Sequence, residues 1–104
     1  MSNFPLEREG AKVRVIIGDE LTVSVVQELR ELLCAIADDG VKDLVLDFSK
    51  TTFLDTAGLS LLLAARNTFF QEDPKALKLA CVQPPIFSLL KTLGLEQRLN
   101  VQMG

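Results

Sequence analysis

The sequence predicts an α/β fold built on a mixed, mostly parallel β-sheet of four to five strands. Three segments, near residues 22–38, 57–72 and 84–93, repeat apolar residues at helical spacing. Short runs rich in β-branched and large apolar residues lie before and between them. Helices between successive later strands favour right-handed crossovers and parallel neighbours. The expected order is therefore β-β-α-β-α-β-α.

The first two strands are expected to form a hairpin. Residues 12–17 alternate with the period of a strand that has one face more buried than the other, and Phe4 and Leu6 alternate likewise. Glu9-Gly10 lies between the two runs and can turn the first strand into the second.

The first helix is expected from Thr22 and ends near Asp38-Asp39-Gly40, where the glycine can adopt the left-handed cap. We expect the two carboxylates there to face solvent. The apolar stripe of this helix contains Val25, Val26, Leu29, Leu32, Leu33 and Ile36. The next segment, VKDLVLDF, is short and bounded by Gly40 and Ser49, which suits a central strand covered on both faces.

The second helix is expected from about Ala57 and should end before Asp73-Pro74, because the residue before a proline disfavours helical backbone. Its predicted apolar side contains Leu59, Leu62, Leu63, Phe69 and Phe70. The run ALKLACV, residues 76–82, then predicts another buried strand.

Pro84-Pro85 opens the third helix, since proline is well tolerated in a first turn, and Gly94 caps its end. The predicted apolar stripe contains Ile86, Leu89, Leu90 and Leu93. The tail GLEQRLNVQMG can add an edge strand.

Length and composition exclude several classes of protein. At 104 residues the chain fits one domain, residues 1–104, with a modest core. A net charge of −3 with scattered basic residues argues against nucleic acid as a partner. The longest apolar run is far shorter than the ~20 residues that span a bilayer, and the N-terminus lacks a signal-peptide pattern. We expect no membrane insertion and a cytoplasmic location.

Catalytic, metal and cofactor sites are not expected. The chain has no histidine to activate Thr56, Ser60 or a cysteine as a nucleophile. It also has no glycine-rich loop of the kind that cradles a nucleotide. Cys34 and Cys81 lack CxxC spacing, so we expect both to be buried, reduced and structural.

The stretch FLDTAGLSLLLAAR, residues 53–66, places an acid, a hydroxyl and a glycine just before a long apolar run. One interpretation is an N-cap, in which Asp55 or Thr56 accepts a hydrogen bond from a backbone N–H of the next turn. The other is that an exposed Thr56 hydroxyl at a strand-to-helix junction is a phosphoryl acceptor, at a position where a phosphate is compatible with the helix. Both can hold together.

LVLDFSKTTFLDTAGLSLLL resembles the signature of STAS domains, the family of bacterial anti-sigma factor antagonists, in which a strand ending in Asp precedes Asp-Ser/Thr-x-Gly-Leu. Asp47 matches the acid at the strand end, Asp55 the acid before the acceptor, Thr56 the phosphoacceptor and Gly58-Leu59 the helix residues. Glu20-Leu21-Thr22 and LKLACVQPPIFSLLKTLGLEQRLNV also resemble family segments. The resemblance implies a STAS-type fold with helices packed mainly on one side of the sheet.

Two residues depart from the family pattern. Thr22 stands where many relatives carry an Asp near the acceptor, and Thr56 stands where serine is commoner. The resemblance implies that Thr56 is the phosphorylated residue of a partner-switching regulator of transcription. It also implies a partner-binding surface shaped by Glu20, Thr22, Asp47, Asp55, Ala57, Gly58 and Ser60.

The implied partner is an anti-sigma factor of the serine/threonine kinase type, which binds the unmodified protein and releases the phosphorylated one. No cofactor is implied, and we expect a monomer or a weak dimer. The alternative is a cytoplasmic STAS subunit of an ABC-type lipid transporter, whose motif DTAGLSLLL also resembles, with Thr56 as an interface residue on the ATPase subunit. No set of residues argues for the third possibility, a small-molecule binding domain.

Overall fold

The computed structural model of the chain describes residues 4–69 and 76–103. The strands are β1 Leu6–Glu9, β2 Lys12–Ile16, β3 Glu20–Leu21, β4 Asp43–Asp47, β5 Phe53–Leu54, β6 Leu77–Val82 and β7 Val101–Met103. The helices are α1 Val26–Asp38, α2 Thr56–Ala64 with the π-helical turn η1 Ala65–Phe69, and α3 Pro84–Thr92.

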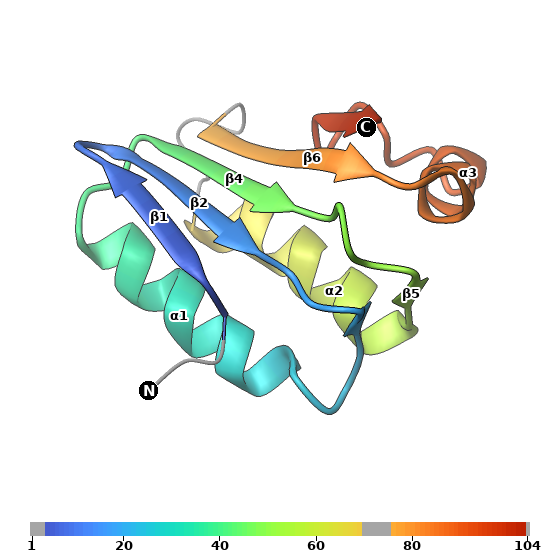
Figure 1. Cartoon of the computed structure of the whole chain (residues 1–104), viewed down its shortest axis with the longest axis horizontal. Coiled ribbons are helices and arrows are strands. Elements are labelled where there is room, and N and C mark those ends of the chain that lie inside the picture. The colour runs from blue at the N-terminus through green and yellow to red at the C-terminus, as the bar shows by residue number, and fades with distance from the viewer. Residues whose placement is uncertain (1–3, 70–75, 104) are drawn as a thin grey trace.

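Five strands form the main sheet in the order β1-β2-β4-β6-β7 (Figure 1). β1 and β2 pair antiparallel, and Gly10 turns the chain between them with φ +60°, so the predicted hairpin is confirmed. The pairs β2–β4, β4–β6 and β6–β7 are all parallel. The mixed, mostly parallel sheet is confirmed, including the edge strand from the C-terminal tail.

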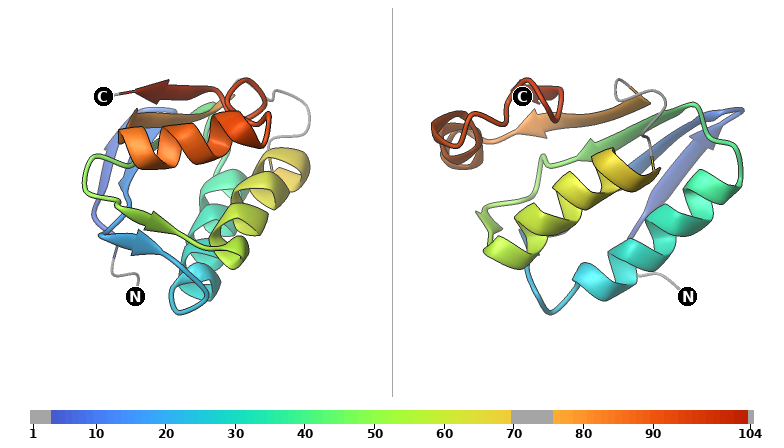
Figure 2. Two further views of the ribbon diagram at one scale, coloured as in Figure 1. Left: turned by 90° about the vertical axis from the view of Figure 1, so that its right-hand side faces the viewer. Right: turned by 180° about the vertical axis from the view of Figure 1, so that it is seen from behind.

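Both crossover helices, α1 and α2, cover the same face of the sheet and lie side by side when the molecule is seen from behind (Figure 2, right). Within the described residues no helix covers the opposite face, yet Val45 and Asp47 of β4, which point to it, are only 8% and 7% exposed. Neighbouring side chains cover them, among them Arg14, whose guanidinium binds Asp47. The central strand is therefore buried on both faces, as expected, but helices lie on one face only.

Two short strands were not predicted. β3 and β5 pair parallel, Glu20 with Phe53 and Leu21 with Leu54, in a separate two-stranded sheet beyond the carboxyl ends of β2 and β4. Two residues are too few to show the alternating pattern by which a strand is read from sequence. This small sheet brings the segment before α1 next to the segment before α2.

Helix α1 begins at Val26, four residues later than expected from Thr22. The carbonyl of Thr22 accepts hydrogen bonds from the N–H groups of Val25 and Val26, so a turn precedes the helix. The helix ends as predicted, since Gly40 has φ +77° and Asp38 and Asp39 are exposed. Residues Leu29, Leu33 and Ile36 of the predicted stripe are buried in the core.

The predicted apolar side of α2 is only partly correct. Gly58, Leu61 and Leu62 are buried, whereas Leu59 and Leu63 are half-buried. Nearly every residue of this run is apolar, so spacing alone could not select the inward face. The Phe69 side chain, Phe70 and the expected helix end before Asp73-Pro74 lie outside the described residues.

Helix α3 lies at the end of the sheet, beside the carboxyl end of β6 (Figure 1). Pro84 begins it and Gly94, with φ +71°, follows it, as predicted. The predicted stripe is wrong in part, because Leu89 and Leu93 are 39% and 49% exposed. Only one edge of this helix packs on the core, and that edge holds Ile86 and Leu90.

Candidate functional site

The candidate site is the junction between β5 and α2. Asp55 has an extended backbone, and its Oδ1 accepts a hydrogen bond of 2.8 Å from the N–H of Gly58. Asp55 is therefore the N-cap. The sequence left this role open between Asp55 and Thr56. Hydrogen bonds from the N–H groups of Gly58 and Val23 hold the pKa of Asp55 below its ordinary value.

Thr56 is the first residue of α2 and is exposed. Because Asp55 supplies the cap, the fold does not require the Thr56 hydroxyl. The unpaired N–H groups of a first helical turn carry partial positive charge, which favours a negative group at this position. Thr56 is thus accessible and lies where a phosphoryl group is compatible with the helix.

Asp55 also connects the two segments that the small sheet brings together. Its Oδ2 accepts a hydrogen bond of 3.0 Å from the N–H of Val23, and its own N–H donates to the carbonyl of Leu21 at 3.3 Å. The left view of Figure 2 looks onto this end of the molecule, where β3 and β5 run side by side next to the first turn of α2. One carboxylate therefore caps α2 and fixes the chain before α1.

Gly58 is required by close packing. A Cβ atom on this residue would lie 2.3 Å from the carbonyl oxygen of Leu21 and 2.8 Å from Cδ1 of Leu54. The backbone of β3 therefore approaches α2 more closely than any side chain permits. This explains the glycine of the motif sterically, without any need for an unusual backbone conformation.

The other residues expected to shape the site lie in different environments. Glu20 and Ser60 are exposed, and Ser60 lies one helical turn after Thr56, on the same side of α2. Ala57 is half-buried. Thr22 is only 7% exposed, and among the described residues its hydroxyl oxygen has no hydrogen-bond partner. Thr22 is therefore part of the packed support beneath the site, not of its surface.

Asp47 is not brought to Thr56. Its Oδ2 binds Nη2 of Arg14 at 2.7 Å on the face of the sheet without helices, and its Oδ1 accepts from the N–H of Ser49 at 2.8 Å. Burial acts to raise the pKa of Asp47, but the hydrogen bonds from Ser49 and Arg14 outweigh it and lower that pKa. Through Ser49, Asp47 is connected to the loop that leads from β4 to β5.

Sequence reasoning missed the residues that hold this loop. The hydroxyl of Thr51, which is fully buried, donates to the carbonyl of Gly18 at 2.8 Å, and the N–H of Thr52 donates to the carbonyl of Asp19 at 2.8 Å. These bonds align β3 with β5. Nothing in the sequence pattern distinguished the two threonines, because each depends on a partner more than 30 residues away.

Two exposed apolar side chains lie on the two chain segments that meet beside the start of α2, and they were also missed. Val23, whose N–H binds Asp55, is 70% exposed, and Phe53, two residues before Asp55, is 53% exposed. Large apolar side chains at such exposure, on segments next to the exposed Thr56, are typical of a protein-interaction surface.

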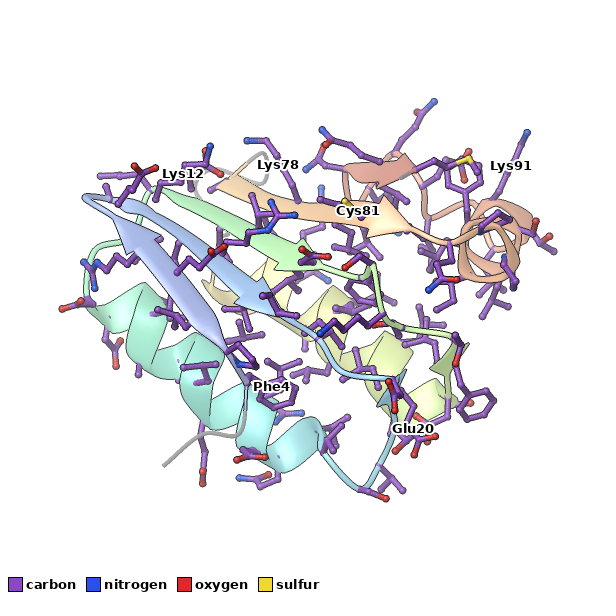
Figure 3. All side chains as sticks on the ribbon, viewed as in Figure 1. Phe4, Lys12, Glu20, Lys78, Cys81 and Lys91 are labelled. Carbon is purple, nitrogen blue, oxygen red and sulfur yellow. The ribbon has the colours of Figure 1, made fainter. Side chains whose placement is uncertain are left out.

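The two cysteines lie on different elements, Cys34 on α1 and Cys81 on β6. Cys34 and Cys81 are free thiols but only half-buried, so the expectation of full burial was wrong. Cys81 lies on the open face of the sheet (Figure 3), 3.9 Å from Nη2 of Arg14. Within residues 4–69 and 76–103, no three potential ligands gather to hold a metal ion. No helix in this part of the chain is long and apolar enough to cross a membrane.

Known proteins with similar sequences and structures support the resemblance. A family model described as "Mlab, STAS domain" matches residues 4–102. The anti-sigma-B factor antagonist of Staphylococcus aureus (strain NCTC 8325) is 31% identical over 90 residues, which cover 86% of this chain and 82% of that protein.

Solved structures share the fold. The unphosphorylated anti-sigma factor antagonist SpoIIAA superimposes with a TM-score of 0.79 at 20% identity, covering 96% of this chain and 85% of that chain. An anti-sigma factor antagonist from Mycobacterium paratuberculosis superimposes with a TM-score of 0.80 at 18% identity, covering 96% and 84%. With a family model over nearly its whole length and a close fit to two such folds, the chain belongs to the STAS domain family.

Proposed function

We propose that the protein is an anti-sigma factor antagonist that binds a kinase-type anti-sigma factor through the surface around Thr56 and is released when Thr56 is phosphorylated. The observation that carries the proposal is the division of roles at the junction. Asp55 caps α2, while the adjacent Thr56 hydroxyl is exposed. The relative named as an anti-sigma-B factor antagonist supports the same role.

The proposed switch is electrostatic and local. A phosphate on Thr56 adds about −1.5 to −2 charges and three acceptor oxygens. The carboxylate of the adjacent Asp55 already carries negative charge, so a partner that packs on this surface meets two anionic groups. Each tenfold change in affinity corresponds to about 1.4 kcal/mol. A penalty of about 3 kcal/mol for desolvating the phosphate therefore weakens binding about a hundredfold, which is enough to release the partner.

The exposed apolar side chains supply the contacts that this switch interrupts. Val23 and Phe53 lie on the segments next to Thr56, and truncation of a central aromatic residue at an interface commonly costs about 2 kcal/mol or more, about thirtyfold in affinity. The protein itself needs no catalytic group. The kinase supplies the nucleotide, the metal ions and the groups that activate the hydroxyl.

The alternative function, a STAS subunit of an ABC-type lipid transporter, is favoured by the run DTAGLSLLL. The structure gives this run a second explanation, because Leu61 and Leu62 are buried in the core. The leucines are thus required by packing in either role. What separates the two functions is whether Thr56 accepts phosphate.

Labelling with ATP tests the proposal. The protein is used to purify its ATP-binding partner from cells that produce it, and the pair is then incubated with labelled ATP and mapped by peptide analysis. We expect label on Thr56 and none in Thr56→Ala, which should still bind. Thr56→Glu should bind about tenfold more weakly or worse, because its carboxylate carries part of the charge of a phosphate. Binding without any label would instead support the transporter role. Label on Ser60 would identify Ser60, one helical turn after Thr56, as the acceptor.

A further inference from the structure

A groove of about 470 Å³ lies between the start of β1, the β2–β3 connection and the first turn of α1. Its apolar lining includes Phe4, Ile16 and Val25. Figure 3 shows Phe4 near the start of β1, where it overlaps α1 in this view, and Glu20 nearer the end of the molecule that holds the small sheet. The lining of the groove does not include Thr56, but Glu20 of β3 lines it and pairs with Phe53 of β5, which leads to Thr56.

The charged side chains of the groove are mostly acidic. Asp19, Glu20 and Glu28 line it together with Lys50, so three carboxylates face one ammonium group and the net charge is −2. An apolar lining with an acidic margin is complementary to a side chain that has a long aliphatic stem and a cationic end. Neither an anionic ligand nor a purely apolar one matches both features.

The groove is continuous with the surface proposed to bind the kinase. Glu20 begins β3, which pairs with β5, and β5 leads directly into Asp55 and Thr56. Val23 follows β3 in the chain and precedes the Val25 of the groove by two residues. A partner that covers Thr56 therefore reaches the groove without leaving this end of the molecule.

We propose that the groove receives an arginine or lysine side chain that projects from the anti-sigma factor. Its aliphatic stem packs on Phe4, Ile16 and Val25, and its cationic end lies among the carboxylates of the margin. This proposal rests on the proposed function and adds a second anchor to it. Arginine is enriched among the residues that dominate interface affinity, and a buried cation needs paired carboxylates.

The first test fills the groove. Gly18 lines the groove, and a Cβ atom on it meets no atom within 4 Å, so Gly18→Leu adds apolar volume to the groove from an open position. We expect the purified kinase to bind Gly18→Leu at least about tenfold more weakly, as for loss of one interface anchor. The matched control is Ala35→Leu, which adds similar volume at an exposed position of α1 outside the groove and should bind normally.

The second test removes charge. Asp19→Asn combined with Glu28→Gln should weaken binding about tenfold at low salt and reduce its salt dependence, whereas Glu31→Gln, exposed on α1 outside the groove, should not. Replacing by Glu the arginine or lysine of the kinase that enters the groove should weaken binding to the wild type but not to Glu28→Lys, in which the charges are exchanged. These charge variants test the groove proposal even if Gly18→Leu does not fold.

Thr56→Glu separates failure of the groove proposal from failure of the proposed function. If Thr56→Glu loses the kinase but the groove variants bind normally, the groove proposal is wrong and the function stands. If all variants, including Thr56→Glu, bind normally, both are wrong. If Gly18→Leu instead changes the molecular mass in solution without changing kinase affinity, the occupant is a second copy of the chain and the proposal is also wrong.

Discussion

Replacing Gly58 by alanine tests the close contact on which the site is built. In an ordinary helix interior this change is stabilising by about 1 kcal/mol, because alanine restricts the unfolded chain and favours helix. Here the added Cβ would lie 2.3 Å from the carbonyl oxygen of Leu21, a backbone atom that no side-chain rotation can move. The structure and the helix propensity therefore predict effects of opposite sign.

The magnitude follows from the contacts that must change. Forcing extra volume into a packed site costs about 1–3 kcal/mol. Moving β3 away from α2 also strains the 3.3 Å hydrogen bond from the N–H of Asp55 to Leu21, worth about 1 kcal/mol. After the gain in helix propensity is subtracted, we expect Gly58→Ala to lower the free energy of unfolding by about 2 kcal/mol.

Urea denaturation followed by circular dichroism measures this effect. The midpoint should fall while the slope of the free energy against urea stays unchanged, and the thermal midpoint should drop by about 8–16 °C. Gly18→Ala is the matched control, because its Cβ meets no atom within 4 Å and its stability should change by less than about 1 kcal/mol. A Gly58→Ala protein as stable as the wild type would show that β3 does not press on α2 as described.

Three further predictions follow from hydrogen bonds and charge. Thr22→Val should leave the free energy of unfolding unchanged or raise it by up to about 1 kcal/mol, since the buried hydroxyl has no hydrogen-bond partner among the described residues. A clear loss of stability in urea denaturation would show that the hydroxyl does have a partner. Thr51→Val should cost about 1–3 kcal/mol in the same assay, because the carbonyl of Gly18 loses its donor, and Thr51→Ser should recover part of the loss. The folded-state pKa values of Asp55 and Asp47 are lowered, so their contribution to stability is complete above the unfolded pKa of about 3.9 and is lost as pH falls through the folded values. Thermal midpoints measured from pH 6 to pH 2 should therefore fall mainly below about pH 4, and Asp55→Asn should show a shallower decline.

Much of the fold could be predicted because its signals are local. Alternation marked β2, helical spacing marked α1, and the glycines Gly40 and Gly94 marked helix ends that the structure confirms. The parallel order followed from the alternation of helices and strands. The inward face of α2 could not be predicted, since an almost wholly apolar helix gives the same pattern for every face.

The site was predictable only where its chemistry is contiguous in sequence. Asp55 and Thr56 were placed correctly because cap and hydroxyl lie in one motif. The small sheet and the bond from Thr51 to Gly18 join segments more than 30 residues apart, and no local pattern records such contacts. Asp47 was grouped with the site by the family resemblance, and its carboxylate binds both the N–H of Ser49 in the loop after β4 and Arg14 on the open face, a partner that the sequence did not indicate.

Under the proposed function, the separation of the cap, Asp55, from the proposed acceptor, Thr56, explains how one site can hold the fold and still be switched. If Thr56 were the N-cap, a phosphate on its oxygen would remove the hydrogen bond that begins α2 and cost about 1 kcal/mol of stability. Because Asp55 makes that bond and also holds Val23, the structure around Thr56 is fixed by a group that phosphorylation leaves untouched. The phosphate would then change the charge of the surface and not its shape. A regulator of the proposed kind would alternate between binding and release without unfolding, because the phosphate on Thr56 would change its affinity for the partner through charge.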